Sequence, residues 1–284
     1  MRSTVMTTII LAAGQGRRLR PITDHLPKCL VPVGGAPILT HTLERIRQVG
    51  GTDVLLVTGF EADRVRWHVR RRPVNGVRVR FVDNPRFADT NNLYSLALAL
   101  DEVDGAMTVI NGDDLFNVHI LAALQAGDAP AAAAVDFSRP LLPDAMKTAV
   151  AGNRVIALGK EMPADRAAGN AIGLYRFSAH AVPLLRAEVA RWLADGRLGA
   201  FYVAAINAMA SGVPIEAVST RGFSWCEVDD ARDLAAAPAK LNQILAEERA
   251  SSLATRRRAR RGYHGTFHRG DREHASPTSL EVRA

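Results

Sequence analysis

A glycine-rich segment near the start of the sequence is followed by cationic side chains. Ile9 to Leu11 is apolar and typical of the end of a buried strand. The small residues after it leave backbone N–H groups open to a ligand, because no bulky side chain covers them. Arg18 and Lys28 then add positive charge. Backbone donors and cations together favour binding of a polyphosphate. The residues predicted to surround it are Leu11, Ala12, Ala13, Gly14, Gln15 and Gly16.

A plain strand-to-helix turn would also use glycine, but the density of small and cationic residues between Ala12 and Lys28 favours a binding loop. The order L-A-A-G-x-G-x-R-L, P-x-T, P-K-x-L and P-V-x-G-x-P-I-L resembles the signature of the sugar-phosphate nucleotidyltransferase superfamily. The resemblance implies transfer of a nucleoside monophosphate from an NTP to a phosphorylated acceptor. In that reaction we expect Arg18 to hold the β- and γ-phosphates and Lys28 to neutralise charge at the α-phosphoryl group.

Two adjacent acids follow a second apolar run. Gly112 permits a sharp turn after this strand, and Asp113 then lies at the carboxyl end of the strand, where ligands bind in open α/β folds. A carboxylate that faces a triphosphate needs a cation between them, so the sequence predicts Mg²⁺. The alternative is an acid that caps a helix beginning near Phe116. Both functions fit if Asp113 binds the metal and Asp114 is a cap or an outer partner.

A second acidic motif lies far along the chain. The run E-V-D-x-x-x-D-L from residue 227 resembles the superfamily motif E-I-D-x-x-x-D-L, which implies that Asp229 joins Asp113 in holding the metal. Taken alone, Asp229 or Asp230 could simply cap the last helix.

The loop over residues 84–100 carries several amides before a helix that we expect to begin near Leu93. Asn91, Asn92 and Ser95 are predicted to contact the nucleotide, with helix capping as the plainer interpretation. The run NP-x-F-A-D-x-NN-x-YSL resembles the corresponding loop of bacterial CTP:phosphocholine cytidylyltransferases. The resemblance implies CTP as the nucleotide.

Periodicity predicts alternating strands and helices in the first half, at 37–49, 53–59, 61–71, 77–82 and 107–110. This order favours parallel strands covered by helices on both faces. The expected fold is α/β, with a Rossmann-like, mixed and mostly parallel sheet of the nucleotide-diphospho-sugar transferase type. Short strands at 145–150, 154–160 and 170–177 resemble the acceptor-binding part that the superfamily inserts into the same sheet.

The acceptor is predicted less sharply than the nucleotide. Candidate acceptor-binding residues are Lys147, Lys160, Tyr175, Trp225 and Glu227. A lone lysine usually lies on a solvated face, and the alternative is a clamp on the acceptor phosphate. The run M-K-x-x-V followed by G-K resembles a set of bacterial cytidylyltransferase relatives, and this resemblance favours Lys147 over Lys160. A lysine at position 147 also disfavours a cationic head group. Phosphocholine, an aminoalkyl or hydroxyalkyl phosphonate, and a polyol phosphate such as inositol phosphate all stay open.

Composition limits the other classes of function. The net charge is +7, but residues 251–284 hold eight Arg against three acids, a net charge of +5. The basicity therefore belongs to a tail, which we expect to be disordered, and nucleic acid is not an expected partner. No apolar run is long enough for a membrane span and none has the form of a signal peptide. Two cysteines offer no disulfide framework, so a cytoplasmic protein is expected.

The sequence therefore predicts a catalytic domain over residues 1–250 and a basic tail over 251–284. The nucleotide half covers about 1–130 and the acceptor half about 131–250. The predicted function is a CTP-dependent cytidylyltransferase that uses Mg²⁺ and a small phosphorylated or phosphonate acceptor. An NDP-sugar pyrophosphorylase that uses UTP, dTTP or GTP, or a non-catalytic nucleotide-binding relative, are the alternatives. A homo-oligomer is compatible with the sequence.

Overall fold

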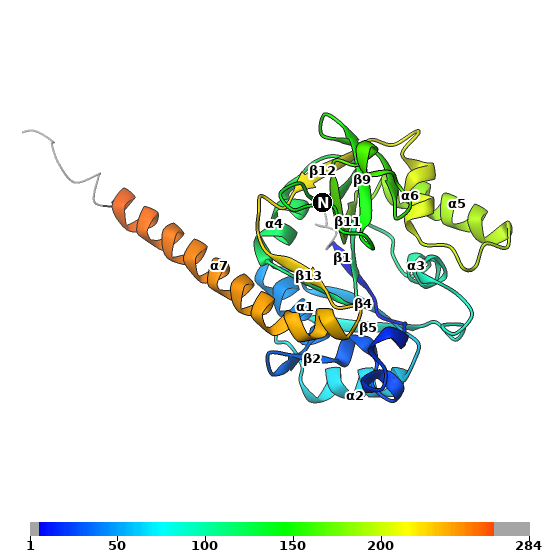
Figure 1. The fold of residues 1–284 in the computed structure, drawn as a ribbon, viewed down its shortest axis with the longest axis horizontal. Helices are drawn as coiled ribbons and strands as arrows, with labels where there is room; N and C mark the ends of the chain where they lie inside the picture. Colours follow the sequence, from blue (N-terminus) through cyan, green and yellow to red (C-terminus); the bar gives the residue numbers. More distant parts are fainter. Residues whose placement is uncertain (1–5, 264–284) are drawn as a thin grey trace, which may run out of the picture. The chain divides into compact units, whose positions relative to one another are not determined.

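A mixed sheet forms the centre of the protein (Figure 1). The computed structural model describes residues 6–263, with side chains described up to residue 253, and the chain divides into two units, residues 1–248 and 249–284. In the described part of the chain, nine strands form this sheet in the spatial order β5 (Arg78–Asp83), β4 (Asp53–Thr58), β1 (Thr7–Leu11), β6 (Met107–Asn111), β11 (Gly169–Phe177), β8 (Ala131–Asp136), β12 (Ile215–Ser219), β10 (Arg154–Gly159) and β9 (Met146–Ala151).

The sheet has a parallel side and a largely antiparallel side. β5, β4, β1 and β6 pair in parallel, with β1 between β4 and β6. β11 then runs antiparallel to both β6 and β8, whereas β12 is parallel to β8. β10 and β9 form an antiparallel hairpin, and β9 also pairs with the start of β11. The predicted Rossmann-like α/β fold with a mixed sheet is confirmed, and its antiparallel pairs lie mostly in the second half of the chain.

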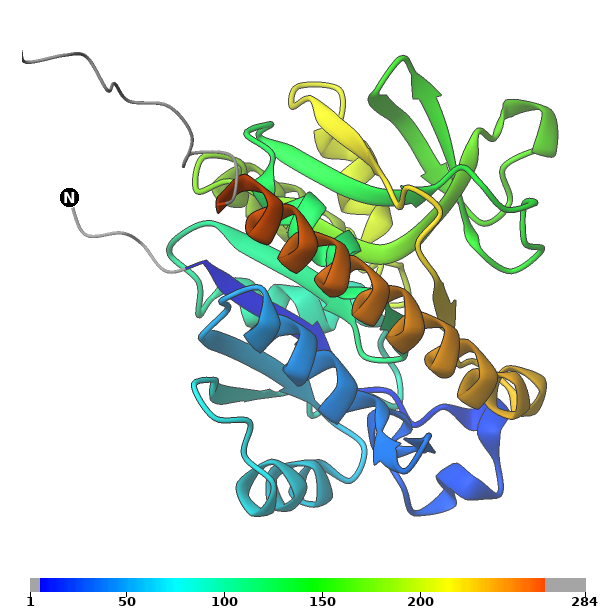
Figure 2. The ribbon, with the colours of Figure 1, turned by 90° about the vertical axis from the view of Figure 1, so that its left-hand side faces the viewer.

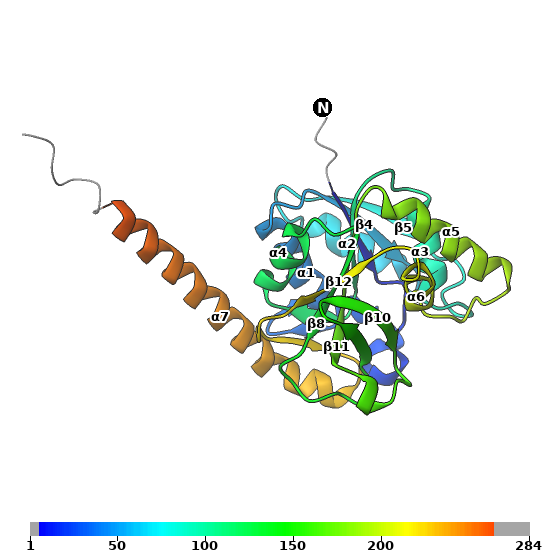
Figure 3. The same ribbon diagram turned by 90° about the horizontal axis from the view of Figure 1, so that it is seen from above.

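Helices cover both faces of the sheet, as Figures 1 and 3 show. The helices of the described residues are α1 (Ile38–Gln48), α2 (Ala62–Arg71), α3 (Asn92–Leu100), α4 (Val118–Ala126), α5 (Ala181–Ala194), α6 (Val203–Met209) and α7 (Ala231–Tyr263). Alternation along β1 decides which face each side chain supports. Ile9 and Leu11 pack with α3, α5 and α6, whereas Ile10 packs with α1, α2 and α4. Each of these burials stabilises the fold by about 1.5–3 kcal/mol.

Several short elements lie outside the main sheet and its helices. Short 3-10 turns follow the loop at Arg17–Leu19, Ile22–Asp24 and Lys28–Leu30, with a further turn at Ala164–Arg166. Short paired strands are β2 (Pro32–Val33) with β3 (Ala36–Pro37), and β7 (Asp114–Phe116) with β13 (Trp225–Glu227).

A separate apolar cluster holds the start of α7 against the segment that follows the loop. Leu19 and Val31 pack in it with Leu241 and Ile244. Figure 2 shows the first turns of α7 beside the blue segment that follows the loop. The pairing of β13 with β7 and this cluster together bring Asp229 beside the first acidic motif, more than a hundred residues away in the sequence.

Two predictions of local structure are wrong. Residues 114–116 form the strand β7, and the following helix begins at Val118 with Asn117 as its cap. These residues pair with β13 as a strand and are therefore not part of the helix. The last helix continues to Tyr263, so the predicted disorder is wrong for 251–263, where Ala, Leu and Arg favour helix and no glycine occurs before Gly262. Residues 264–284 lie outside the described residues. None of the described helices is long and apolar enough to cross a membrane.

Candidate active site

A cavity of about 610 Å³ opens at the carboxyl ends of β1 and β6. This volume suits a small-molecule ligand. Of the residues predicted to form a site, all except Gln15 and Lys147 line this cavity. The lining residues are Leu11, Ala12, Ala13, Gly14, Gly16, Arg18, Lys28, Asn91, Asn92, Ser95, Gly112, Asp113, Lys160, Tyr175, Trp225, Glu227 and Asp229.

The glycine-rich loop has open backbone donors. Among the residues that the structure describes, none accepts a hydrogen bond from the N–H groups of residues 13–16. Gly16 has a left-handed backbone, with φ of 75°, and a Cβ there would lie 2.9 Å from Cβ of Lys28. Glycine is therefore required at this position, because the Lys28 side chain passes directly over it. Open N–H groups beside a lysine are the arrangement that a polyphosphate needs.

Gln15 supports the loop instead of facing the cavity. Its side-chain Nε2 donates to the carbonyl of Thr23 at 3.3 Å. Thr23 is fully buried, and its Oγ1 donates to the carbonyl of Gly16 at 2.8 Å. Gln15 was predicted to contact the nucleotide through its backbone N–H, and its side-chain amide is used by the loop's own turn.

Lys28 joins the two predicted metal ligands. Its ammonium donates to both Asp113 and Asp229, and the Lys28 side chain is 13% exposed. Burial alone would lower the pKa of Lys28, but the two carboxylates raise it above its ordinary value. Burial acts on Asp229 in the opposite sense, and Lys28 and Arg18 hold the pKa of this carboxyl below its usual range. Arg18 contacts Asp229 at 2.5 Å and is otherwise largely exposed.

Glu227 joins the predicted pair Asp113 and Asp229 in an acidic cluster, a position that the sequence did not predict for it. Asp113, Glu227 and Asp229 offer ligand oxygens that all lie within 4.8 Å of one another. Burial, followed by the charge of Asp113, raises the pKa of Glu227 to about 8. An oxygen-only donor set of this kind fits Mg²⁺. The sequence placed Glu227 with the acceptor, and β13 places it directly opposite Asp114 of β7.

Asp114 lies behind this cluster and is not a helix cap. Its side chain is buried, and burial with the neighbouring acids raises its pKa well above the ordinary value. Asp230 takes the capping function, because its carboxylate accepts hydrogen bonds from the N–H groups of Arg232 and Asp233. Of the two acids that the sequence offered as a cap for the last helix, Asp230 is the one that caps it.

The amides at the nucleotide end are held by internal hydrogen bonds. Asn91 caps α3 by accepting from the N–H of Asn92 at 2.8 Å, and it also lines the cavity. Asn92 accepts from the N–H of Tyr202, and Ser95 accepts from Asn84 at 3.1 Å. Asn84 and Tyr202 were not among the predicted site residues. Asn84 could have been predicted, because its amide stands at the start of the same loop. Tyr202 could not, because it comes from a distant segment of the sequence.

The two candidate lysines differ in position. Lys147 donates to the carbonyls of Pro143 and Lys160, at 3.1 and 2.6 Å, and does not line the cavity. Lys160 lines the cavity, with its ammonium 5.4 Å from the ring centre of Phe201. The predicted preference for Lys147 over Lys160 is therefore not supported by the geometry. Carbonyls just before β9 and just after β10 hold the Lys147 ammonium.

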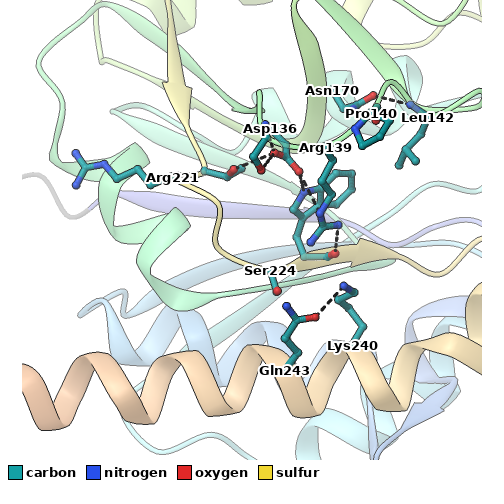
Figure 4. A network of polar contacts seen from close by, with 12 residues as sticks. Asp136, Arg139, Pro140, Leu142, Asn170, Arg221, Ser224, Lys240 and Gln243 are labelled. Carbon is teal, nitrogen blue, oxygen red and sulfur yellow. Dashed lines mark hydrogen bonds and ion pairs between the residues drawn. The ribbon is translucent and has the colours of Figure 1, made fainter.

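Aromatic residues at the acceptor end already have partners. Tyr175 is buried and its ring meets Tyr202 edge-on, with the ring centres 5.6 Å apart. Trp225 is 3% exposed, and its indole N–H donates to Asp136 at 2.7 Å. The guanidinium of Arg139 lies 5.3 Å from the Trp225 ring centre. Figure 4 shows Arg139 and Asp136 side by side in this network.

Comparison with known proteins identifies the family. A model of the family described as nucleotidyl transferase matches residues 7–242. The chain belongs to the nucleotidyl transferase family. Over 135 residues, or 48% of this chain, it is 41% identical to CMP-5'-(3-aminopropyl)phosphonate synthase of Streptomyces rubellomurinus, of which the match covers 21%. Over 111 residues, or 39% of this chain, it is 34% identical to choline-phosphate cytidylyltransferase of Streptococcus pneumoniae, of which the match covers 46%.

Other nucleotidyl transferases are similar as well. UTP--glucose-1-phosphate uridylyltransferase of Haloferax volcanii is 30% identical over 115 residues, which are 40% of this chain and 46% of that protein. The matches therefore span from about a fifth to a half of the length of these curated relatives. Among solved structures, inositol-1-phosphate CTP transferase from T. maritima has a TM-score of 0.71 at 21% identity, over 84% of this chain and 96% of that chain. That likeness supports the fold.

Proposed function

We propose that this nucleotidyl transferase transfers CMP from CTP to a small phosphonate or phosphate acceptor and releases pyrophosphate. The observation that carries the proposal is the meeting of Lys28, Asp113 and Asp229 in a cavity that the glycine-rich loop also lines. Cation, carboxylates and open backbone donors are the parts that transfer at a nucleoside triphosphate requires.

The reaction needs no covalent intermediate on the protein. An acceptor oxygen forms a bond to the α-phosphorus, the bond from that phosphorus to the bridging oxygen breaks, and its electron pair leaves with pyrophosphate. The N–H groups of residues 13–16 and the exposed guanidinium of Arg18 hold the departing phosphates. Lys28 neutralises charge that builds at the α-phosphoryl group, so catalysis is positioning with charge stabilisation.

Asp113, Glu227 and Asp229 would hold Mg²⁺, because their oxygens lie close together and face the cavity. The ion would supply positive charge where the phosphate oxygens meet these carboxylates. Arg18 and Lys28 keep Asp229 ionised, and an ionised carboxylate is the form that binds a hard cation.

The choice of CTP rests on two observations. The amide-rich loop before α3 lines the cavity, as its resemblance to the cytidylyltransferase loop implies. Two of the similar proteins described above are named as a CMP-phosphonate synthase and a cytidylyltransferase. A second candidate is an NDP-sugar pyrophosphorylase, which the similarity to the Haloferax uridylyltransferase favours.

Pyrophosphate release from a panel of nucleotides and acceptors separates these functions. Each of CTP, UTP, dTTP, GTP and ATP would be incubated with Mg²⁺ and with aminoethylphosphonate, carboxyethylphosphonate, phosphocholine, inositol 1-phosphate or a hexose 1-phosphate. We expect release with CTP and a non-sugar acceptor. Release only with UTP, dTTP or GTP and a hexose 1-phosphate would replace the proposal by its alternative. Tight CTP binding without release across the panel would indicate a non-catalytic relative.

A further inference from the structure

The aromatic faces at the acceptor end are covered by the protein's own cations. Arg139 stands over the ring of Trp225, and Lys160 stands over the ring of Phe201. All four residues line the cavity. A quaternary ammonium is bound by stacking against such faces. The two cations therefore occupy the surfaces that a choline-like head group would need, and they repel its charge.

Arg139 is held in one orientation from several sides. Its Nη1 donates to the carbonyl of Trp225 at 2.9 Å, and its Nε lies 3.4 Å from a carboxylate oxygen of Asp136. Asp136 is fully buried and also accepts from the Trp225 indole and from Ser138. A guanidinium fixed in this way loses little conformational entropy when it binds a ligand.

The loop that carries Arg139 is anchored as well. The buried side chain of Asn170 accepts from the N–H of Leu142 at 3.0 Å and donates to the carbonyl of Pro140 at 3.1 Å (Figure 4). These bonds hold residues 140–142 against the start of β11 and so fix the loop immediately after Arg139. The position of the guanidinium is thus set by the backbone as well as by Asp136.

One edge of the guanidinium is left for a ligand. Within the part of the chain that the structure describes, Nη2 of Arg139 has no hydrogen-bond partner, and the side chain is 26% exposed. Guanidinium N–H groups bind oxyanions more strongly than neutral acceptors. A cation without a ligand on its open edge, in a cavity for a phosphorylated compound, favours a second anionic group at the far end of that compound.

We infer that Arg139 determines acceptor specificity: it binds an anionic oxygen on the head group of the acceptor and excludes a quaternary ammonium. The acceptor is then a small phosphonate or phosphate that carries a second acidic group, such as a carboxylate. This inference rests on the proposed function, because it assumes that the phosphoryl end of the acceptor faces Lys28.

Direct binding tests the inference without turnover. Calorimetry on the full chain, with and without a non-hydrolysable CTP analogue and Mg²⁺, would compare carboxyethylphosphonate, aminoethylphosphonate and phosphocholine. The first two share the ethylphosphonate part and differ in the head group, which is a carboxylate in one and an ammonium in the other. We expect carboxyethylphosphonate to bind about tenfold or more tightly than either cationic compound. Equal or tighter binding of either cationic compound, or no binding of any of the three, would overturn the inference.

Variants assign the preference to Arg139. Arg139→Gln should weaken carboxyethylphosphonate about tenfold and change aminoethylphosphonate by less than about threefold. The matched control is Arg197→Gln, because Arg197 also stands over a tryptophan, 4.7 Å from the Trp192 ring centre, but does not line the cavity. It should leave all affinities unchanged. Equal weakening of all three compounds by Arg139→Gln would contradict the inference.

Two further measurements separate the outcomes. If Arg139→Gln fails to fold, as circular dichroism would reveal, Arg139→Lys keeps the charge and should retain part of the preference, and the wild-type ranking stands as an independent test. The pyrophosphate panel tests the proposed function by itself. Selective binding of the anionic compound without pyrophosphate release from any nucleotide would support the inference and contradict the proposed function.

Discussion

Replacing Lys28 with methionine removes one charge from the centre of the site and keeps the bulk that covers Gly16. Two carboxylates lose their shared ammonium in this variant, although Arg18 still contacts Asp229. Breaking a buried ion pair by removing one partner costs about 3–5 kcal/mol. Because Arg18 remains and the carboxylate side chains are 20% and 14% exposed, we expect the lower end, about 3 kcal/mol. Loss of one preorganised charge should also lower kcat about a hundredfold to a thousandfold.

The pH dependence of this stability loss follows from the direction of the pKa shifts. Asp229 has a pKa below its ordinary value, so its contribution is complete above about pH 4 and is lost as the pH falls through the folded-state value. Lys28 has a raised pKa, so its contribution is complete below its ordinary value of 10.5 and is lost only above that. The stability gap between wild type and Lys28→Met should therefore be full at neutral pH and shrink in acid.

Urea denaturation at pH 7 and at about pH 3 measures the gap, with Mg²⁺ left out, and pyrophosphate release measures kcat. Lys240→Met is a matched control, because Lys240 lies on α7 outside the residues that line the cavity, and its ammonium donates to Gln243 at 2.9 Å. A kcat within about threefold of wild type would refute the reasoning about catalysis. An equal gap at both pH values would refute the reasoning about the ion pair.

Three further predictions concern the same cluster. Mg²⁺ should raise the melting temperature of the full chain, and Asp113→Asn should abolish most of that increase, because the cluster loses a charged ligand; an equal increase in the variant would exclude this site. Glu227→Gln should gain stability relative to wild type as the pH rises from about 5 to about 8 in urea titrations without metal, because the wild-type carboxyl ionises in the unfolded chain but stays protonated in the fold, where its pKa is about 8. A constant difference across that range would contradict this prediction. Gly173→Ala should destabilise the fold by more than about 2 kcal/mol, because the new Cβ would lie 2.1 Å from a carboxylate oxygen of Asp114 at a backbone φ of 77°, and unchanged denaturation would show that the strand can shift.

The sequence was most informative where function depends on the local backbone. Gly16 and Gly112 could be recognised because a side chain there would collide with Lys28 or with the end of β1. Asp113 could be predicted because it lies two residues after the end of a buried strand. These features need only neighbouring residues, so a pattern of residue types is enough to reveal them.

The acceptor end depends on contacts between distant segments, and local patterns do not encode these. Trp225 lies on β13, and the pairing of β13 with β7 brings its indole within hydrogen-bond distance of Asp136. The position of Arg139 over the Trp225 ring depends on the same pairing. Lys147 was preferred over Lys160 from its motif alone, whereas the fold of the β9–β10 hairpin ties its ammonium to carbonyls. The membership of Glu227 in the acidic cluster likewise depends on strand register, because β13 places it opposite Asp114.

Product formation tests the central claim most directly. The full chain would be incubated with CTP, Mg²⁺ and a phosphonate acceptor, and the mixture would be analysed by mass spectrometry for a CMP–phosphonate conjugate alongside pyrophosphate. We predict equal amounts of the two products with wild type and a loss of about a hundredfold or more with Lys28→Met. Pyrophosphate without a conjugate, or no product from any nucleotide and acceptor pair, would contradict the account.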